Sequence, residues 1–179
     1  MTDHGWKKWE VIGLLLTLAA GNLLHFVYDW SGENMIVAAV SGVNESVWEH
    51  MKLLAMPWIL WSVVEVIVLR RCRLPILSAR TVGLLVGLLV IPLLYYSYTG
   101  ATGVNVSLID IVIFQLAVLA AFGSSWFLLQ RRWFCGLFWQ LLGGIVLAGM
   151  LTLFVWWTYR TPQLPIFVDP VTQQRGMKK

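Results

Sequence analysis

Hydrophobic residues dominate this chain in long blocks separated by short polar segments. Five blocks, at residues 9–28, 46–69, 81–98, 107–129 and 134–158, are long enough to cross a membrane, since a hydrocarbon core of about 30 Å needs roughly 20 helical residues. None shows the alternation of a barrel strand, and an open backbone finds no hydrogen-bond partner in lipid. The pattern therefore predicts an all-α, polytopic membrane helix bundle with five transmembrane helices, residues 1–179 forming one domain.

Two further segments are apolar but too short to span. Residues 34–43 lie between glycine-containing turns and cover only about 15 Å as a helix. We expect a short interfacial or re-entrant half-helix here, before the second span. The C-terminal tail, residues 159–179, combines prolines with Ile166, Phe167 and Val168. An exposed polar tail would not carry these apolar side chains together, so we expect it to pack back across the outer face.

Charge adds an orientation to this picture. Only 12% of residues are charged, which excludes an ordinary soluble domain. Eight basic residues lie on one side of the predicted spans: Lys7, Lys8, Arg70, Arg71, Arg73, Arg80, Arg131 and Arg132. The loops on the other side, residues 29–45 and 99–106, have no Lys or Arg. The positive-inside rule then predicts a cytoplasmic N-terminus and an outer C-terminus, although the basic tail runs against this bias.

The same distribution bears on partners and redox state. The net charge of +4 comes from short loops rather than from one basic face, so the expected partner is the lipid bilayer and no nucleic acid. Cys72 and Cys135 both fall on the predicted cytoplasmic side, which predicts free thiols. Residues 9–28 lack a small-residue cleavage site, so we interpret them as a retained span rather than a signal peptide.

Ionisable residues gather at one predicted depth, in the outer part of the bilayer. His25 lies near the end of the first span, Glu49 and His50 open the second, and Asp110 opens the fourth. Such groups are costly near hydrocarbon and mark a functional site by default. We predict that these four form an outer-facing catalytic site, or that they hold a divalent metal such as zinc. The predicted supporting residues are Asn44, Glu45, Lys52, Tyr28 and Tyr98.

Each of these residues also has a structural interpretation. Ser46 and Glu49 have the spacing of a capping box, and Glu49 and Lys52 have that of a surface ion pair. A helix turns about 100° per residue, so the pocket is expected to include either His50 or Lys52 but not both. Deeper in the bundle, Glu65 is expected to pair with Arg70 or Arg71.

Several motifs resemble a family of small bacterial integral membrane proteins that is known as a domain of unknown function. The resemblance rests on His25–Gly32, on the NESVWEH block at Asn44–His50, on Tyr98–Gly100 with Asp110, and on Ile166–Pro170. Gln174-Arg175-Gly176 departs from the pattern, because an aromatic residue is expected before this glycine. The resemblance implies location in a bacterial inner (plasma) membrane and indicates which residues belong together, but it supplies no reaction.

Three classes of function therefore remain open. The first is an intramembrane hydrolase or transferase acting on a lipid-like substrate or another small-molecule ligand. The second is an ion or small-solute transporter or channel subunit, and the third is a non-catalytic membrane partner, with homo-oligomerisation left open. Transporters place their sites near the midplane and use internal repeats, which this chain lacks. The outer position of the cluster therefore favours the enzyme.

Overall fold

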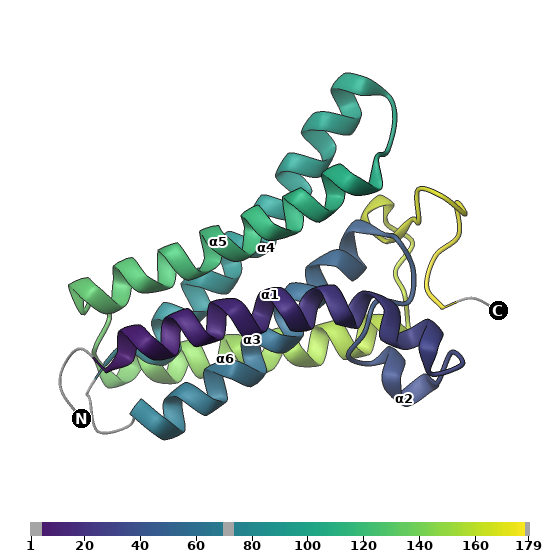
Figure 1. Ribbon diagram of the computed structural model, residues 1–179. Coiled ribbons are helices and arrows are strands. Elements are labelled where there is room, and N and C mark those ends of the chain that lie inside the picture. Colours follow the sequence, from purple (N-terminus) through teal and green to yellow (C-terminus); the bar gives the residue numbers. More distant parts are fainter. Residues whose placement is uncertain (1–4, 70–73, 178–179) are drawn as a thin grey trace.

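The computed structural model describes residues 5–69 and 74–177 and shows an all-helical bundle (Figure 1). Its long helices are α1 (Trp6–Trp30), α3 (Val47–Leu69), α4 (Ile76–Thr102), α5 (Ser107–Arg131) and α6 (Leu137–Tyr159). All five are long and apolar enough to cross a membrane. The predicted fold class, a membrane helix bundle with five spanning helices, is confirmed.

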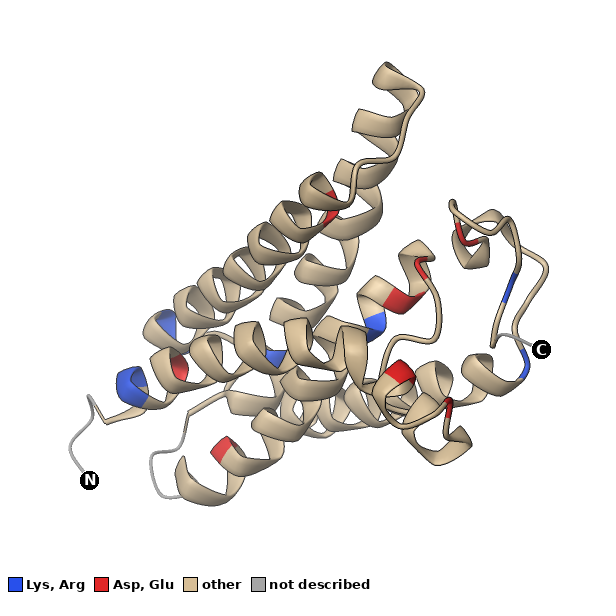
Figure 2. Cartoon of the chain, turned by 45° about the vertical axis from the view of Figure 1, so that its right-hand side comes forward, with Lys and Arg blue, Asp and Glu red and all other residues tan. Residues whose placement is uncertain are grey.

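The two ends of the bundle differ in charge. One end holds the short helix α2 (Met35–Ala38), the turn between α4 and α5, and the C-terminal segment, and we call it the α2 end. The opposite, basic end holds the start of α1 and the end of α5, with Lys7, Lys8, Arg131 and Arg132 (Figure 2). Which end faces the cytoplasm stays a prediction from the loop charges. Cys135 is a free thiol, and Cys72 lies outside the described residues.

Helix α3 forms the centre of the bundle and packs against α1, α4 and α6. Trp58, Leu54 and Met56 are almost fully buried there. Pro57 lies inside α3, so the carbonyl of Leu53 has no proline N–H to accept from. Gly21 of α1 packs directly on that carbonyl, because a Cβ at this position would lie 3.0 Å from its oxygen.

Helix α1 buries a polar and small-residue face and exposes its apolar one. Glu10, Gly13, Thr17 and Gly21 are buried and recur at intervals of three or four residues, which is one helix face. Exposed apolar side chains cover the opposite side: Leu15, Leu16, Leu23 and Phe26. A bilayer accommodates such a helix, because lipid is as apolar as a protein core and small residues allow close helix packing.

Helices α4 and α5 form a hairpin that diverges from the other helices toward the α2 end (Figures 1 and 2). The third span was expected at residues 81–98, but α4 begins at Ile76 and ends at Thr102. Hydropathy placed the start too late because Arg80 was counted as a loop residue. The structure buries Arg80 completely inside α4, as described below.

The expected half-helix is shorter than the apolar stretch from which it was predicted. Helix α2 covers only Met35–Ala38, within the predicted range of residues 34–43, and Asn34 begins it by accepting the Ile36 N–H at 2.8 Å. Ile36 is 82% exposed at the α2 end. The C-terminal segment folds back onto this end, where the short 3-10 helix η2 (Pro165–Phe167) buries Phe167 in the core.

Candidate functional site

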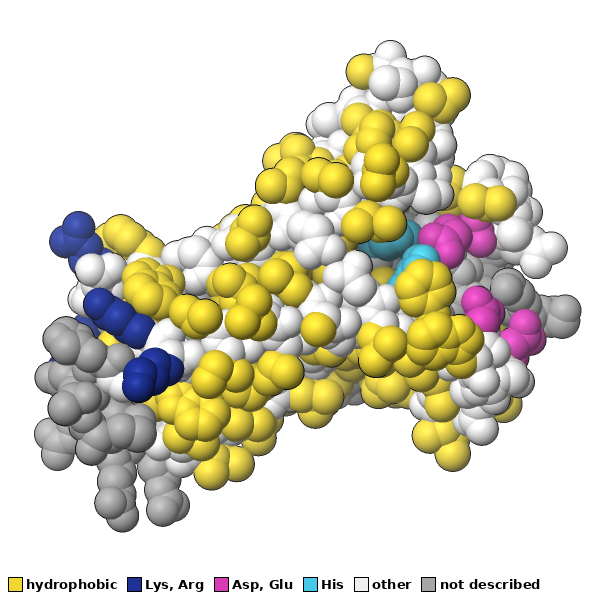
Figure 3. All heavy atoms as spheres, viewed as in Figure 1, with side chains coloured by type: hydrophobic (Ala, Val, Ile, Leu, Met, Phe, Trp, Pro, Cys, Tyr) yellow, Lys and Arg dark blue, Asp and Glu magenta, His cyan; other side chains and the backbone are white. Residues whose placement is uncertain are grey.

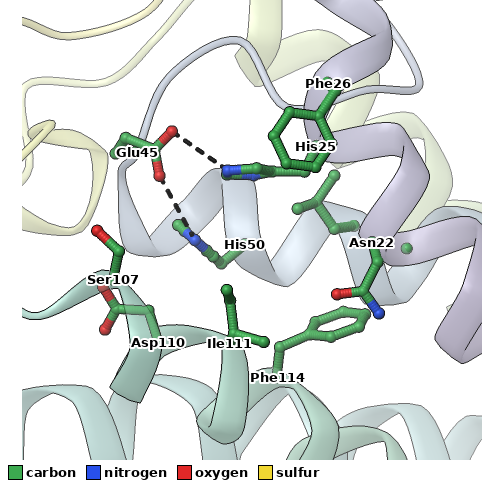
Figure 4. Close-up of a pocket in the computed structure, with 11 residues that line it drawn as sticks. Asn22, His25, Phe26, Glu45, His50, Ser107, Asp110, Ile111 and Phe114 are labelled. Atoms are coloured by element: carbon green, nitrogen blue, oxygen red, sulfur yellow. Dashed lines mark ion pairs between the residues drawn. The ribbon is translucent and has the colours of Figure 1, made fainter.

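A pocket lies between α1, the start of α3 and the start of α5, where the α4–α5 hairpin diverges. Its volume is about 270 Å³, and Figure 3 shows imidazole groups within a hollow on the side of the molecule. Apolar side chains, among them Phe26, Leu53, Ile111 and Phe114, form much of its wall. The polar lining residues are Asn22, His25, Glu45, His50, Ser107 and Asp110 (Figure 4).

Glu45 lies between two imidazole rings in this pocket (Figure 4). Its Oε1 is 3.3 Å from His25 Nε2, and its Oε2 is 3.8 Å from His50 Nε2. One potential ligand atom from each of the three residues lies within 4.8 Å of the other two. The three residues come from α1, the loop before α3, and α3 itself, so the fold assembles a compact donor set from separate segments.

The orientation of His50 is fixed by its own helix. His50 Nδ1 lies 3.0 Å from the carbonyl oxygen of Ser46, which can only accept a hydrogen bond. Nδ1 therefore carries a hydrogen, and in the neutral ring Nε2 presents a lone pair toward Glu45. A lone pair facing a carboxylate oxygen is unfavourable unless a proton or a cation lies between them. Metal-binding histidines commonly have this arrangement, in which the second ring nitrogen donates to a backbone carbonyl.

Asp110 lines the pocket from α5 and is held by two side chains. Its Oδ1 accepts the Tyr98 hydroxyl hydrogen at 2.6 Å, and its Oδ2 accepts from Asn105 Nδ2 at 2.8 Å. The amide of Asn105 also lies 3.0 Å from the Tyr98 oxygen. Tyr98 near the end of α4 and Asn105 in the loop before α5 thus orient this carboxylate, which Figure 4 shows across the pocket from His25.

Comparison of the chain with known families agrees with the resemblance that the sequence motifs indicated. The model of a family of unknown function, DUF6512, matches residues 2–177, nearly the whole chain. The chain belongs to this family. No curated protein and no solved structure matches it. Membership in DUF6512 confirms the resemblance to an uncharacterised family and leaves the function to be argued from the pocket.

Within this DUF6512 chain, Glu49 is not a lining residue of the pocket. Its Oε2 accepts from Lys52 Nζ at 2.6 Å and from the Val43 N–H at 3.2 Å, and both charged side chains are buried. Lys52 also donates to the Ala38 carbonyl at 2.9 Å and to the Thr158 hydroxyl at 3.0 Å. The pair therefore fastens α3 to α2 and α6. The helical turn of about 100° separates Glu49 from His50, which faces the pocket.

The expected capping box is formed only in part. The Ser46 hydroxyl accepts the Glu49 N–H at 3.4 Å, as the motif requires. The reciprocal bond is absent between these two residues, because the Ser46 N–H donates to Asn44 Oδ1 at 2.9 Å. Asn44, expected to support the site, thus holds the turn that carries Glu45 and leads into α3. Tyr28 is buried and packs beside Ala38 rather than lining the pocket.

A second ionisable cluster was missed by the sequence analysis. Arg80 lies between Glu10 of α1 and Glu65 of α3, and all three side chains are at most 2% exposed. Arg80 Nη2 is 3.1 Å from Glu10 Oε1 and also pairs with Glu65, to which Arg80 Nε donates at 2.6 Å. The guanidinium carbon lies 4.8 Å from the ring centroids of both Trp58 and Phe122. We call Glu10, Glu65 and Arg80 the buried triad.

The buried triad corrects one expectation and adds a partner to a second. Arg80 is an interior residue of α4 and not an anchor in a loop, which leaves seven basic residues in the predicted cytoplasmic segments. Glu65 was expected to pair with Arg70 or Arg71, which lie outside the described residues, but it pairs with Arg80 and accepts from Trp61 Nε1 at 3.1 Å. Three contacting helices set this pairing, which no spacing within one helix could indicate.

Proposed function

We propose that this multi-pass membrane protein is a metal-dependent hydrolase that cleaves an ester or amide bond in a lipid-like substrate. The observation that carries the proposal is the approach of His25, Glu45 and His50, whose ligand atoms lie within 4.8 Å of one another. Two imidazoles and one carboxylate are a ligand set typical of catalytic zinc, which keeps a fourth position for water or substrate. Glu45 takes the place that the sequence analysis gave to Glu49.

The walls of the pocket support an amphiphilic substrate. Phe26, Ile111 and Phe114 line the cavity next to the polar donors, so one molecule would contact both apolar and polar groups. The hollow opens on the side of the bundle, among exposed apolar side chains, in the view of Figure 3. A lipid-like molecule would therefore enter from the bilayer with its cleavable bond near His25 and His50. In this proposal the pocket lies on the outer side of a bacterial plasma membrane.

Asp110 is the proposed general base. The ion would bind through His25, Glu45 and His50 and would lower the pKa of a bound water. Asp110 would accept a proton from that water while the water oxygen attacks the carbonyl carbon of the substrate. The bond from this carbon to the leaving oxygen or nitrogen then breaks, and Asp110 returns the proton to the leaving group. Tyr98 and Asn105 hold the carboxylate in position for both transfers.

Zinc binding by the purified protein in lipid nanodiscs tests this proposal. We expect one zinc ion per chain, and at least about 100-fold weaker binding after Glu45→Gln or His50→Asn, because each removes a direct ligand. Glu33→Gln is the matched control, since Glu33 is an exposed acid between α1 and α2 that is absent from the donor set. Wild-type protein without zinc affinity, or unchanged affinity in both ligand variants, would overturn the metal site.

Hydrolysis is tested on the zinc-loaded protein with a mixture of bilayer lipids and mass spectrometry of the products. We expect products from the wild type and from Glu33→Gln, and none from Asp110→Asn, which retains an acceptor for Tyr98 but cannot serve as a base. Equal turnover by Asp110→Asn would exclude its role as base. Zinc binding without turnover of any lipid would refute the hydrolase and leave a metal-binding membrane protein.

A further inference from the structure

The loop that carries Glu45 is held by the distant C-terminal segment. The Glu45 N–H donates to Asp169 Oδ2 at 3.4 Å, and the neighbouring Asn44 Nδ2 donates to the Gly176 carbonyl at 2.9 Å. The side chain of Glu45 is 45% exposed, and within the described residues its ion pairs are those with the two histidines. Its placement between the imidazoles therefore depends on where the backbone of this loop is held.

Asp169 is itself rigidly placed. Its Oδ1 accepts the backbone N–H groups of Val171 at 2.7 Å and Thr172 at 3.2 Å, and its own N–H donates to the Gln174 carbonyl at 2.9 Å. The residue is 4% exposed. These bonds close a turn in which one carboxylate oxygen holds the tail and the other faces the Glu45 amide.

An aromatic contact docks this turn on the bundle. Phe167, two residues before Asp169, is 2% exposed, and its ring lies 4.9 Å from Trp48 of α3 and 5.6 Å from Trp157 of α6. Val168 pairs with Arg175 in an isolated antiparallel bridge, which holds the two sides of the turn together. The tail is thus fixed to the same helix, α3, that carries His50.

The charge of Asp169 suits this role. Burial alone would raise the pKa of Asp169, but hydrogen bonds from the backbone of Val171, from Thr172 and from the Glu45 N–H together lower the pKa below its usual value. The geometry itself makes this carboxylate an acceptor for the Glu45 amide, whose nitrogen lies 3.4 Å from Oδ2.

We propose that Asp169 is a positioning residue for the metal site, and that the C-terminal segment completes this site by holding Glu45 between His25 and His50. The inference rests on the proposed metal site and adds the element that sets its carboxylate ligand. An exposed glutamate on a free loop would have to be ordered when the metal binds, and this ordering reduces affinity. A backbone already held by Asp169 removes part of that cost, as supporting residues do in metal sites generally.

Asp169→Asn separates the contact with Glu45 from the fold of the tail. Asparagine keeps an oxygen that accepts from Val171 and Thr172, but it places an NH₂ group opposite the Glu45 N–H. In nanodiscs we expect zinc affinity to fall about 10- to 100-fold, while the thermal unfolding of the zinc-free protein changes little. X-ray absorption of the zinc-loaded variant should still show the imidazole scattering of two histidines, because the ligand set of the loaded protein is unchanged. Gln174→Ala, an exposed change in the same turn, is the control and should bind as the wild type does.

A second measurement needs no variant of the tail. Coupling between two sites is reciprocal, so if the tail favours zinc binding, zinc must favour docking of the tail by the same factor. Hydrogen exchange of residues 165–176 in the wild type should therefore slow on adding zinc, and should not slow in Glu45→Gln. Wild-type protein that fails to bind zinc would overturn the proposed function together with this inference. Zinc binding with an unchanged Asp169→Asn affinity and unchanged tail exchange would overturn the positioning role alone.

Discussion

Removing the charge of Arg80 should destabilise the bundle more than most single substitutions. Arg80→Met leaves Glu10 and Glu65 buried side by side without their cation, while methionine fills much of the vacated volume. Loss of one partner of a buried ion pair typically costs about 3–5 kcal/mol, because the remaining charge stays buried and uncompensated. The remaining donors, Ser125 to Glu10 at 3.1 Å and Trp61 to Glu65, are neutral and offset only part of this cost.

The contact of Arg80 with aromatic rings adds to the expected loss. The guanidinium lies over Trp58 and Phe122, and a desolvated cation–π contact contributes roughly 2 kcal/mol. Contributions within one cluster are not additive, so we retain about 3–5 kcal/mol as the expected total. Unfolding of the detergent-solubilised protein, followed by tryptophan fluorescence during titration with a denaturing detergent, would measure the difference.

The control is the triple variant Arg80→Met, Glu10→Gln, Glu65→Gln, which removes all three charges at once. Replacing a whole buried ionic cluster by neutral groups is often neutral or stabilising, so the triple variant should recover most of the stability lost in Arg80→Met. A loss below about 1 kcal/mol in Arg80→Met would refute this electrostatic reasoning. So would a triple variant as unstable as the single one, since packing rather than charge would then explain the loss.

Three further outcomes test other parts of the structure. In a variant whose only thiols are Cys135 and Ala101→Cys, a membrane-impermeant maleimide should label residue 101 in intact cells and Cys135 only after permeabilisation; the reverse would invert the predicted topology. The pKa of Asp169 in the folded protein lies below its ordinary value of 3.8. Ionised Asp169 therefore stabilises the docked tail at pH values above 3.8, and this stabilisation is lost as the pH falls through the pKa of the folded protein. Protease cleavage of the tail should accordingly rise at acid pH in the wild type and show a weaker pH dependence in Asp169→Asn; parallel profiles would contradict the assignment. Gly21→Val should narrow the pocket, because even a Cβ there would lie 2.3 Å from Phe114 Cζ, and it should weaken binding of any lipid-like ligand more than binding of zinc; equal effects on both would count against a separate apolar subsite.

Hydropathy predicted the number of spans correctly because a helix in lipid must be apolar along its length, whatever it contacts. It placed the start of α4 incorrectly because Arg80 is neutralised by side chains from α1 and α3, and hydropathy scores a charge without its partners. The buried face of α1 was not predicted from the sequence for the same reason. Its Glu10 is buried, although an acid at the start of a span is usually expected to face water.

The region of the pocket was located correctly from the sequence, but not all the residues that line it were identified. His25, His50 and Asp110 were expected to converge, and the structure places all three in its wall. Glu45 was predicted to support Glu49, but Glu45 lines the pocket and Glu49 does not. Glu45 belongs to a loop before α3 whose path the helical spacing cannot determine. The backbone of that loop donates a hydrogen bond to Asp169, which lies 124 residues away in the chain. Contacts of this length leave no periodic signal in one sequence.

The buried triad has a consequence for how the chain enters a membrane. Burying an arginine in a span without a counter-charge is costly, although less so near a helix end than at its centre. Arg80 lies four residues after the start of α4, which has no acidic residue of its own. Its partners, Glu10 and Glu65, lie on helices that are synthesised earlier. Helix α4 should therefore leave the translocation machinery together with α1 and α3 rather than alone, and truncated chains that lack α1 should insert α4 inefficiently. We therefore expect the ion pairs of the buried triad to couple the insertion of α4 to that of α1 and α3.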